Sequence, residues 1–550
     1  MIQMKKTNTL LYVATVVCCL AGVFFYSCKK APLEPVEVYP NPPNALVKFL
    51  DGAPSPAIGS EGSIVTYKVS GLKGKEGQFK FFINQTEAEV VSVDENEVKV
   101  KVPLNCSTGG CAILINSEYY FGPTFTVRGK VSIDPLFKPD LYRSNGPILG
   151  IIKNDDGNFV AYGSFTDYQN MASATNTITG IALLDKDGQY LTAASQLKLG
   201  KQGFNGIVSQ VIQIPDGRYM VSGYFSKYDT ISNVNRIARL NSDGTLETTE
   251  VDVINPDPVN DPNGGKAIVP AFNGGLMGGA GGKIFYDDAT GYTTTVGNFS
   301  AHVSTFYERS TKDGPYLDMV KASQLLRMKE DGAYDSSFNF NPATNSSYDG
   351  GNGFVYDAVQ LSDGSLIIVG NFTTFDGSTA NYISRINPTD GKVDPSFNSG
   401  NSGADGSISR ITYNSTTGKI LLTGNFQNYN GQPANGVVMI NADGSIDNSF
   451  SFQKVEGGVA NFAGQLSNGK IIVSGSFTKY DNVVRPGLLI LNADGSLAAG
   501  YNNMGLFRGA INEFIEVSSA NGMPAVIIVG SFDRFDQKEV ANIVKFRMEN

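Results

Sequence analysis

The sequence has little of the chemistry that most enzymes and metal sites need. Its 550 residues include one histidine, His302, no tryptophan and only five cysteines. A zinc site needs several His, Cys or acidic ligands together, and a Ser-His-Asp triad would have to use His302 itself. We therefore expect no catalytic residues, no metal and no cofactor. An enzyme that uses a pair of carboxylates is the open alternative, although no acidic pair stands out from the Asp-Gly turns.

Runs of basic residues are also missing. The chain has 43 Lys and Arg against 52 Asp and Glu, with a formal net charge of −9. Nucleic-acid-binding proteins carry a basic patch, so no nucleic-acid partner is expected. Apolar residues make up 41% of the chain, which is typical of a folded protein. A chain of this length exceeds a single core, so two or more domains are expected.

A long apolar run occurs at the N-terminus. Two lysines precede an apolar stretch over residues 10–26, and Ser27 is followed by Cys28. This resembles a bacterial lipoprotein signal, which implies removal of residues 1–27 and acylation of Cys28. A plain secretory signal or a transmembrane anchor is the alternative. The proline-rich residues 28–42 then favour an extended tether.

The lipoprotein resemblance implies an outer-membrane location with the lipid as the membrane contact. In some bacteria, acidic residues directly after the lipidated cysteine resemble a surface-export signal. Here two lysines come first, and acids follow at Glu34 and Glu37. We expect display at the cell surface, with the periplasmic face as the alternative.

Two further cysteines, Cys106 and Cys111, flank the residues Ser-Thr-Gly-Gly. In an exported protein such a close pair is most simply a disulfide that clips a turn. Metal binding would need two more ligands, and no other cysteine or histidine lies nearby. We expect a Cys106–Cys111 disulfide.

Residues 43–128 have the pattern of a small β domain, with about seven short strands that suggest an immunoglobulin-like (Ig-like) sandwich. The segment resembles the transcription-factor-type Ig-like domain common in surface lipoproteins, through Gly62, Val69-Ser-Gly71, Phe82-Ile-Asn84, Val102-Pro103 and Phe125-Thr-Val127.

Residues 129–550 repeat one phrase, in which a turn and an apolar run precede Gly-x-Phe-x-x-Tyr/Phe. The phrase begins at Gly163, Gly223, Gly370, Gly424, Gly475 and Gly530. The leading-turn glycines recur at intervals of about 50 to 60 residues, at Gly157, Gly217, Gly364, Gly418, Gly469 and Gly522. The widest gap predicts a degenerate unit with Gly274 as its turn, which makes seven units.

Each unit has a second turn, mostly Asp-Gly, and two hairpins give the four strands of one propeller blade. Some units continue with Asp-x-Ser-Phe, and Asp134-Pro-Leu-Phe137 resembles this phrase before the first full unit. We therefore expect the N-terminal segment to supply the missing strand of the last blade and to close the ring. Closure would also hide the sheet edges.

These units resemble the bacterial propeller repeat of roughly sixty residues, known mostly from proteins of unknown function. The expected fold is all-β, with an Ig-like sandwich at 43–128 and a seven-bladed β-propeller at 129–550. The recurrent Phe is expected to pack between blades. Acids at Asp229, Asp376 and Asp536 occur with bases at Arg239, Arg385 and Lys545, which predicts an ion pair within each of three blades.

The third unit carries an insertion at about 280–324 that mixes aromatic and charged residues. Insertions in repeat proteins often form the binding face. The candidate ligand-binding residues are Tyr286, Tyr292, His302, Phe306, Tyr307, Arg309 and Tyr316. A loop that only packs over the propeller is the alternative.

These patterns favour a non-catalytic binding lipoprotein of the cell envelope. Its resemblance to surface glycan-binding lipoproteins implies a polysaccharide or oligosaccharide ligand in polysaccharide uptake. The alternative is a protein–protein interaction scaffold that docks an outer-membrane partner.

Overall fold

A computed structural model describes residues 47–174, 176–191, 203–279 and 281–549. The expected signal peptide, the lipidation site Cys28 and the tether lie outside these residues. From Phe49 onward the chain forms one compact unit. Its described part is built of strands and one short 3-10 helix, η1 (Tyr307–Arg309), so the all-β class is confirmed. No helix in this part is long and apolar enough to cross a membrane.

Residues 48–127 form one curled sheet of eight strands. Residues 86–88 of β5 pair with β4, and residues 89–93 pair with β6, so one strand joins what a sandwich would keep as two sheets. The rings of Tyr67, Phe81 and Phe125 are buried within the curl. In sheet order the strands are β1 (Lys48–Phe49), β3 (Ile64–Ser70), β6 (Glu97–Lys101), β5 (Thr86–Val93), β4 (Phe79–Ile83), β7 (Gly109–Ile115), β8 (Glu118–Val127) and β2 (Ile58–Gly59).

The disulfide expected between Cys106 and Cys111 is not formed, and both thiols are free and buried. The expected Gly-Gly turn is instead the start of strand β7, which gives the two sulfurs separate partners. The Cys111 sulfur lies 3.1 Å from the Tyr67 hydroxyl, and the Cys106 sulfur lies 3.6 Å from the carbonyl oxygen of Ile83. Burial raises the pKa of both thiols to about 12.

Beyond this sheet, a three-stranded antiparallel unit recurs along the chain and gives propeller-like repeats. The middle strands are mostly apolar and buried, except β22, which carries three threonines. In the order first, middle and third strand the units are β10 (Ile148–Lys153), β11 (Phe159–Gly163), β12 (Ile181–Leu184); β13 (Ile207–Gln213), β14 (Tyr219–Tyr224), β17 (Ile237–Leu240); β21 (Lys283–Asp287), β22 (Tyr292–Val296), β25 (Leu325–Met328); β28 (Val355–Gln360), β29 (Leu366–Gly370), β32 (Ile383–Ile386); β33 (Ile408–Asn414), β34 (Lys419–Gly424), β37 (Val437–Ile440); β39 (Ala460–Gln465), β40 (Ile471–Gly475), β43 (Leu488–Leu491); and β44 (Arg508–Ser518), β45 (Pro524–Phe535), β47 (Ile543–Met548).

Short strands connect or extend these units without entering their three-stranded core. They pair mainly as two-residue ladders, which close the turn after Gly-x-Phe or link successive units. Their bounds are β15 (Lys227–Tyr228) with β16 (Ile231–Ser232), β26 (Phe340–Asn341) with β27 (Ser346–Ser347), β30 (Thr374–Phe375) with β31 (Ser378–Thr379), β35 (Asn428–Tyr429) with β36 (Gln432–Pro433), β41 (Lys479–Tyr480) with β38 (Val455–Glu456) and β42 (Val483–Val484), and β46 (Lys538–Glu539) with β45.

The recurrent aromatic residues hold each unit together. The Phe of Gly-x-Phe is at most 4% exposed wherever the phrase occurs, and in several units it lies in one cluster with residues of the preceding unit, which confirms that it packs between units. The tyrosine three residues later links the phrase to the second turn. Its hydroxyl donates to the carbonyl oxygen of the second-turn glycine in four pairs: Tyr168 to Gly188, Tyr228 to Gly244, Tyr429 to Gly444 and Tyr480 to Gly495.

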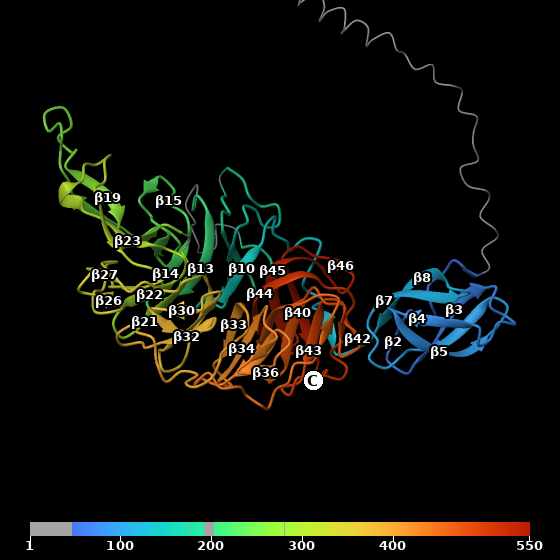
Figure 1. The fold of residues 1–550 in the computed structure, drawn as a ribbon. Helices are drawn as coiled ribbons and strands as arrows, with labels where there is room; N and C mark the ends of the chain where they lie inside the picture. The colour runs from blue at the N-terminus through green and yellow to red at the C-terminus, as the bar shows by residue number, and fades with distance from the viewer. Residues whose placement is uncertain (1–46, 175, 192–202, 280, 550) are drawn as a thin grey trace, which may run out of the picture. The chain divides into compact units, whose positions relative to one another are not determined.

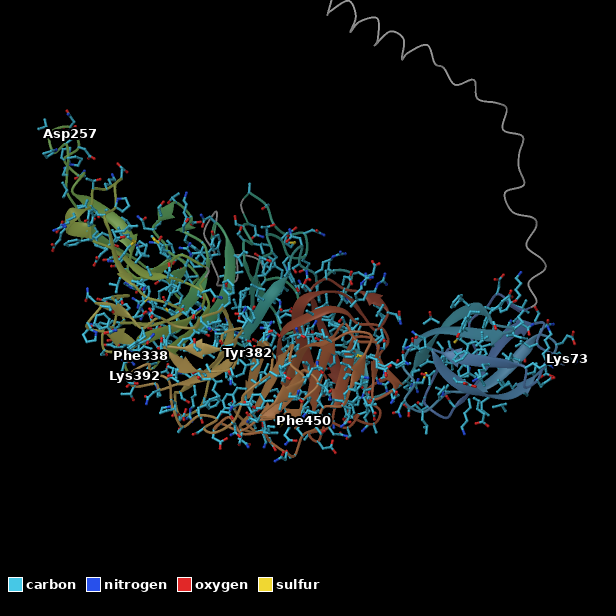
Figure 2. The ribbon with its side chains drawn as sticks, in the orientation of Figure 1. Lys73, Asp257, Phe338, Tyr382, Lys392 and Phe450 are labelled. Carbon is cyan, nitrogen blue, oxygen red and sulfur yellow. The ribbon has the colours of Figure 1, made fainter. Side chains whose placement is uncertain are left out.

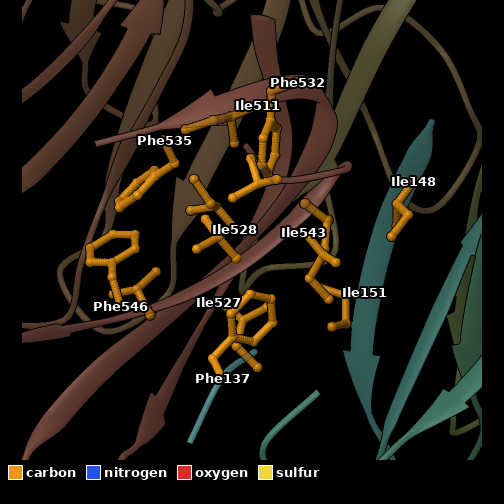
Figure 3. Close-up of a cluster of buried hydrophobic side chains, with 14 of the residues drawn as sticks. Phe137, Ile148, Ile151, Ile511, Ile527, Ile528, Phe532, Phe535, Ile543 and Phe546 are labelled. Atoms are coloured by element: carbon orange, nitrogen blue, oxygen red, sulfur yellow. The ribbon is translucent and has the colours of Figure 1, made fainter. Parts of the chain in front are cut away.

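The first and last units pack against each other. β9 (Val131–Ile133) pairs with β47, which confirms that the N-terminal segment supplies a strand to the last unit. Ile148 and Ile151 of β10 share one apolar cluster with Ile527 and Ile543 (Figure 3). In Figure 1 the sheets follow one another around a common centre, with the C-terminal sheet beside β10.

The third unit lies later in the chain than expected. Its first and middle strands are β21 and β22, whereas Gly274 precedes a short strand outside the unit. Its leading turn, Asp287-Asp-Ala-Thr-Gly291, lacks the Asp-Gly or Asn-Gly pair used to find the others. The Asp287 carboxylate closes this turn by accepting from the Ala289 amide at 3.0 Å. The inserted segment therefore lies after Phe299, and residues 283–296 belong to the repeat.

The three expected ion pairs within units are wrong. Arg239 pairs with Glu247, Arg385 with Asp363 and Asp394, and Lys545 with Asp187 and Asp134. Each of the expected acids instead accepts a backbone N–H from the preceding loop: Asp229 from Gly203, Asp376 from Gly350 and Asp536 from Gly505. These acids have positive φ angles of 47° to 52°, so they sit in turns rather than beside the strand cations.

Candidate functional site

Two extra elements accompany the third unit. β20 (Gly275–Met277), β23 (Ala301–Thr305) and β24 (Leu317–Lys321) form a separate sheet, and β18 (Thr248–Asp252) pairs with β19 (Lys266–Pro270). Asp257, in the loop between β18 and β19, lies at the end of a projection from the repeats (Figure 2). The inserted segment carries four of the candidate residues proposed from the sequence, together with His302 on β23.

Three of the candidate residues gather at the surface. The Arg309 guanidinium lies 5.2 Å from the ring centroid of Phe306 and 5.7 Å from that of Tyr316. The two rings meet edge to face at 6.5 Å. Phe306 is 37% exposed and Tyr316 50% exposed. We call Phe306, Arg309 and Tyr316 the insertion cluster.

The other four candidates lie outside this cluster. His302 is buried, and its Nε2 is hydrogen-bonded to the carbonyl oxygen of Gly332 at 2.9 Å. Burial lowers the pKa of this histidine. Tyr286 and Tyr292 belong to the strands β21 and β22, and burial raises the pKa of Tyr307 to about 12. His302 therefore packs inside the fold and does not belong to the exposed insertion cluster.

A second group of residues, most of them polar, occupies equivalent positions on the first strands of the units. One position on each first strand pairs with the residue just before the glycine of Gly-x-Phe. A register shift precedes this position in most units and turns the strand locally. The residues at this position differ in every unit: Gly150, Gln210, Lys283, Asp357, Arg410, Phe462 and Glu513. We call them the channel belt.

Charged members of the belt face one another. Asp357 is 3% exposed, and its carboxylate lies 3.5 Å from the Lys283 ammonium and 3.6 Å from the Arg410 guanidinium. Arg410 also donates to the Asn512 side chain at 3.2 Å, and Asn512 donates to the carbonyl oxygen of Ile148 at 2.9 Å. The network thus joins side chains from β21, β28, β33 and β44.

Two further titratable groups adjoin this network. Burial raises the pKa of the Glu513 carboxyl, although Lys283 and Arg410 act in the opposite direction. Burial, followed by the charge of Glu513, also raises the pKa of Tyr162. Gly150 leaves the space that the Tyr162 hydroxyl occupies, because a Cβ at Gly150 would clash with it. Together, the belt, Asn512 and Tyr162 therefore combine two cations, two carboxyl groups, two amides and a phenol.

Two cavities share the belt. One, of about 480 Å³, extends toward the turns of the units, where Ser415, Thr416 and Glu516 are exposed. The other, of about 260 Å³, extends toward the opposite ends of the first strands, past Ser209 and Tyr356. Lys283, Asp357, Arg410 and Asn512 line both cavities. The larger cavity falls within the range of about 300–1,000 Å³ usual for small-ligand sites.

The belt offers hydrogen-bond donors and acceptors rather than metal ligands. Within the described ranges, no group of three or more His, Cys, Asp or Glu is placed to hold a metal ion. The cations, amides and hydroxyls can bind oxygen atoms of a ligand, and the carboxylates can accept from its hydroxyls. The arrangement is suited to binding a small polar molecule.

The belt was not predicted from the sequence, because the units share no residue at this position. The belt position lies about seven to nine residues before each leading-turn glycine, and its side chains have nothing in common. A search for the most variable position on a predicted first strand would have found it. Lys283 would still have been missed, since the third unit was placed at Gly274.

Four segments match the family described as domain of unknown function (DUF5122) beta-propeller, at residues 214–249, 361–397, 416–450 and 466–497. The chain is similar to a protein of unknown function from Bacteroides thetaiotaomicron (12% identity, 92% of this chain and 98% of that chain, TM-score 0.25). It is also similar to an auxiliary nutrient binding protein from the same organism (10%, 91% and 97%, 0.35) and to YCF48 from Cyanidioschyzon merolae (11%, 76% and 98%, 0.39). No curated protein matches the chain.

Proposed function

We propose that the protein is a non-catalytic binding lipoprotein of the cell envelope, which binds a glycan in the central channel of a seven-bladed propeller. The proposal rests mainly on the channel belt. Scaffold positions keep the same residue from unit to unit, whereas the belt changes its chemistry in every unit and borders a cavity of about 480 Å³. Variation at one structural position is what recognition of an asymmetric ligand requires.

A glycan suits the mixed character of the belt. Each sugar hydroxyl both donates and accepts a hydrogen bond, so its site needs groups of both kinds. Asp357 and Glu513 can accept, Lys283 and Arg410 can donate, and the Asn512 amide can do both. The insertion cluster supplies exposed rings on which a longer chain could stack. The proposed location is the outer membrane, with Cys28 as the lipid attachment site and the cell surface as the face.

The first test is a binding screen of residues 29–550 against soluble polysaccharides by affinity electrophoresis, followed by calorimetry. We expect one glycan class to bind. Asn512→Leu should weaken this binding at least tenfold, whereas Phe306→Ala, which removes only a stacking ring outside the belt, should weaken it far less. The reverse result would move the site to the insertion cluster. Release of product from any bound glycan would contradict the non-catalytic role.

A protein-interaction scaffold is the second candidate. It is favoured by exposed apolar side chains on the extra elements of the third unit, namely Ile254, Val259, Ile268, Phe306, Tyr316 and Met319. If no glycan binds, crosslinking in the intact envelope should recover an outer-membrane partner. Substitution of Val259 and Met319 by Asp should then abolish the crosslink.

A further inference from the structure

The cations of the channel belt are incompletely satisfied by the protein. The Lys283 side chain is 31% exposed, and Asp357, 3.5 Å from its ammonium, is the only acid that pairs with it among the described residues. It donates no hydrogen bond to a described group. A charge-assisted N–H···O bond is normally about 2.7–2.9 Å long. Lys283 therefore has donors available on the cavity side.

The Arg410 guanidinium is also incompletely paired. Its side chain is 25% exposed and lies 3.6 Å from Asp357, again longer than a direct charge-assisted bond. Of its five N–H donors, one is used in the hydrogen bond to Asn512. The guanidinium borders both cavities. A planar anion in the larger cavity could reach its free edge.

Asp357 is already engaged by the backbone. Its Oδ1 accepts from the Ala358 amide at 3.0 Å and its Oδ2 from the Ile411 amide at 3.3 Å. One buried carboxylate is thus shared among two cations and two amides. Glu513 does not neutralise the second cation by direct pairing, because neither Lys283 nor Arg410 is within ion-pair distance of it in the described part of the chain. Burial raises the pKa of Glu513, which further favours its neutral form.

We propose that Lys283 and Arg410 bind a carboxylate of the ligand, so that the channel recognises an acidic sugar of the uronic acid class. This inference rests on the proposed function of glycan binding. The ligand carboxylate accepts from Lys283 and from the free edge of Arg410. It thereby satisfies N–H donors that Asp357 leaves without a hydrogen bond. Asn512, Gln465 and Asn414 line the same cavity and are positioned for the hydroxyls of the ring.

The test is calorimetry on residues 29–550 with matched ligands: oligogalacturonate and its neutral counterpart oligogalactose, and lactate as a simple carboxylate. We expect oligogalacturonate to bind at least tenfold more tightly than oligogalactose. Lys283→Gln and Arg410→Gln should each remove most of this preference. Lys138→Gln, which removes an exposed cation outside the channel, should leave it unchanged. Thermal unfolding establishes that each variant is folded.

A second measurement needs no variant. Raising the salt concentration from 50 to 500 mM should weaken oligogalacturonate binding several-fold and leave any neutral binding unaffected, since salt screens only the charged contact. Equal binding of acidic and neutral oligosaccharides would overturn the inference and leave the proposed function standing. Binding of lactate without any oligosaccharide would support the carboxylate site and overturn glycan binding. Binding of none of the three would overturn both.

Discussion

At the residue scale, four units keep one hydrogen bond although the side chain that makes it varies. In these units the residue after the second aromatic accepts a backbone N–H from the preceding loop, and it is Asp376 in one unit and Asn430 in the next. Both have φ of +47°, a conformation that Asp and Asn adopt more readily than most residues. Burial raises the pKa of Asp376 to about 6, partly offset by the Gly350 amide. An ionised carboxylate at this position therefore stabilises the folded state less than an amide does.

Asp376→Asn should stabilise the protein at neutral pH. The pKa of Asp376 is higher in the folded than in the unfolded state, so ionisation destabilises the folded state as pH rises from about 4 to about 6. Asparagine keeps the acceptor and removes this effect. We expect the free energy of unfolding to rise by about 1–3 kcal/mol at pH 7, with no gain below about pH 4. Urea unfolding at both pH values measures this.

Asp376→Ala is the matched control, because alanine removes both the acceptor and the preference for positive φ. It should destabilise the protein by about 1–3 kcal/mol at pH 4, where Asp376 is protonated and still accepts. If Asn and Ala behave alike at both pH values, the hydrogen bond to Gly350 has no effect on stability.

The sequence pattern of paired acids and bases was real, but its interpretation was wrong. The cation of the third strand pairs with an acid four residues after the second-turn Asp, as in Arg327 with Asp335 at 2.6 Å. Sequence spacing could not distinguish this acid from the turn acid, since both lie within reach along the chain. The structure distinguishes them in the unit of Arg385, where Asp394 lies 3.7 Å from the guanidinium and Asp376 accepts the Gly350 amide instead.

Loss of the Asp335 carboxylate should be far more damaging than loss of a surface acid. Asp335 is 3% exposed, and hydrogen bonds from Ser337 and Arg327 outweigh its burial to lower its pKa. Asp335→Ala leaves Arg327 without its partner and should cost about 3–5 kcal/mol. Glu87→Ala breaks the exposed pair with Lys80 and should cost at most about 1 kcal/mol. Equal losses in urea unfolding would show that the Arg327 pair is not the stabilising contact.

At the element scale, most units could be predicted because turns and glycine phrases have distinct sequences. The Asp-Gly turns and Gly-x-Phe phrases located every unit that contains both. The position of the third unit was predicted wrongly because the Asp287 carboxylate closes a turn that has no Asp-Gly pair, and because Gly274 matched the expected turn by chance. The prediction of two separate sheets at the N-terminus was wrong for a different reason. Its strands were largely recognised, but nothing local indicates that β5 divides its pairing between β4 and β6.

Strand β9 shows how a short element can matter more than its length suggests. Val131 is 2% exposed and belongs to the apolar cluster that joins the first and last units. Val131→Asp buries a charge there and should lower the free energy of unfolding by about 3 kcal/mol or more. Ile268→Asp, on the exposed face of β19, is the control and should change it by less than about 0.5 kcal/mol. Similar losses would mean that β9 does not stabilise the closure.

At the scale of the whole molecule, pairing of β9 with β47 changes how the repeats should unfold. An open repeat array is quasi-one-dimensional, and its terminal repeats fray first. Here the last unit is covered on its outer edge by β9 and packed against the first unit, so no unit within the repeats occupies an unprotected end. The proposed binding site depends on the same closure, because the Asn512 side chain donates to the Ile148 carbonyl oxygen across the junction of the last and first units.

We therefore expect hydrogen exchange in β47 to be as slow as in β32, a third strand in the middle of the repeats. Exchange of both should require the same global opening, since the closed ring leaves no end from which to unfold locally. Mass spectrometry of peptides covering 543–548 and 383–386 in the full chain measures this. Val131→Asp should speed exchange in β47 and, because the ring is opened, make it faster than in β32. Fast exchange of β47 in the unmodified protein would show that the C-terminal unit frays as in an open array.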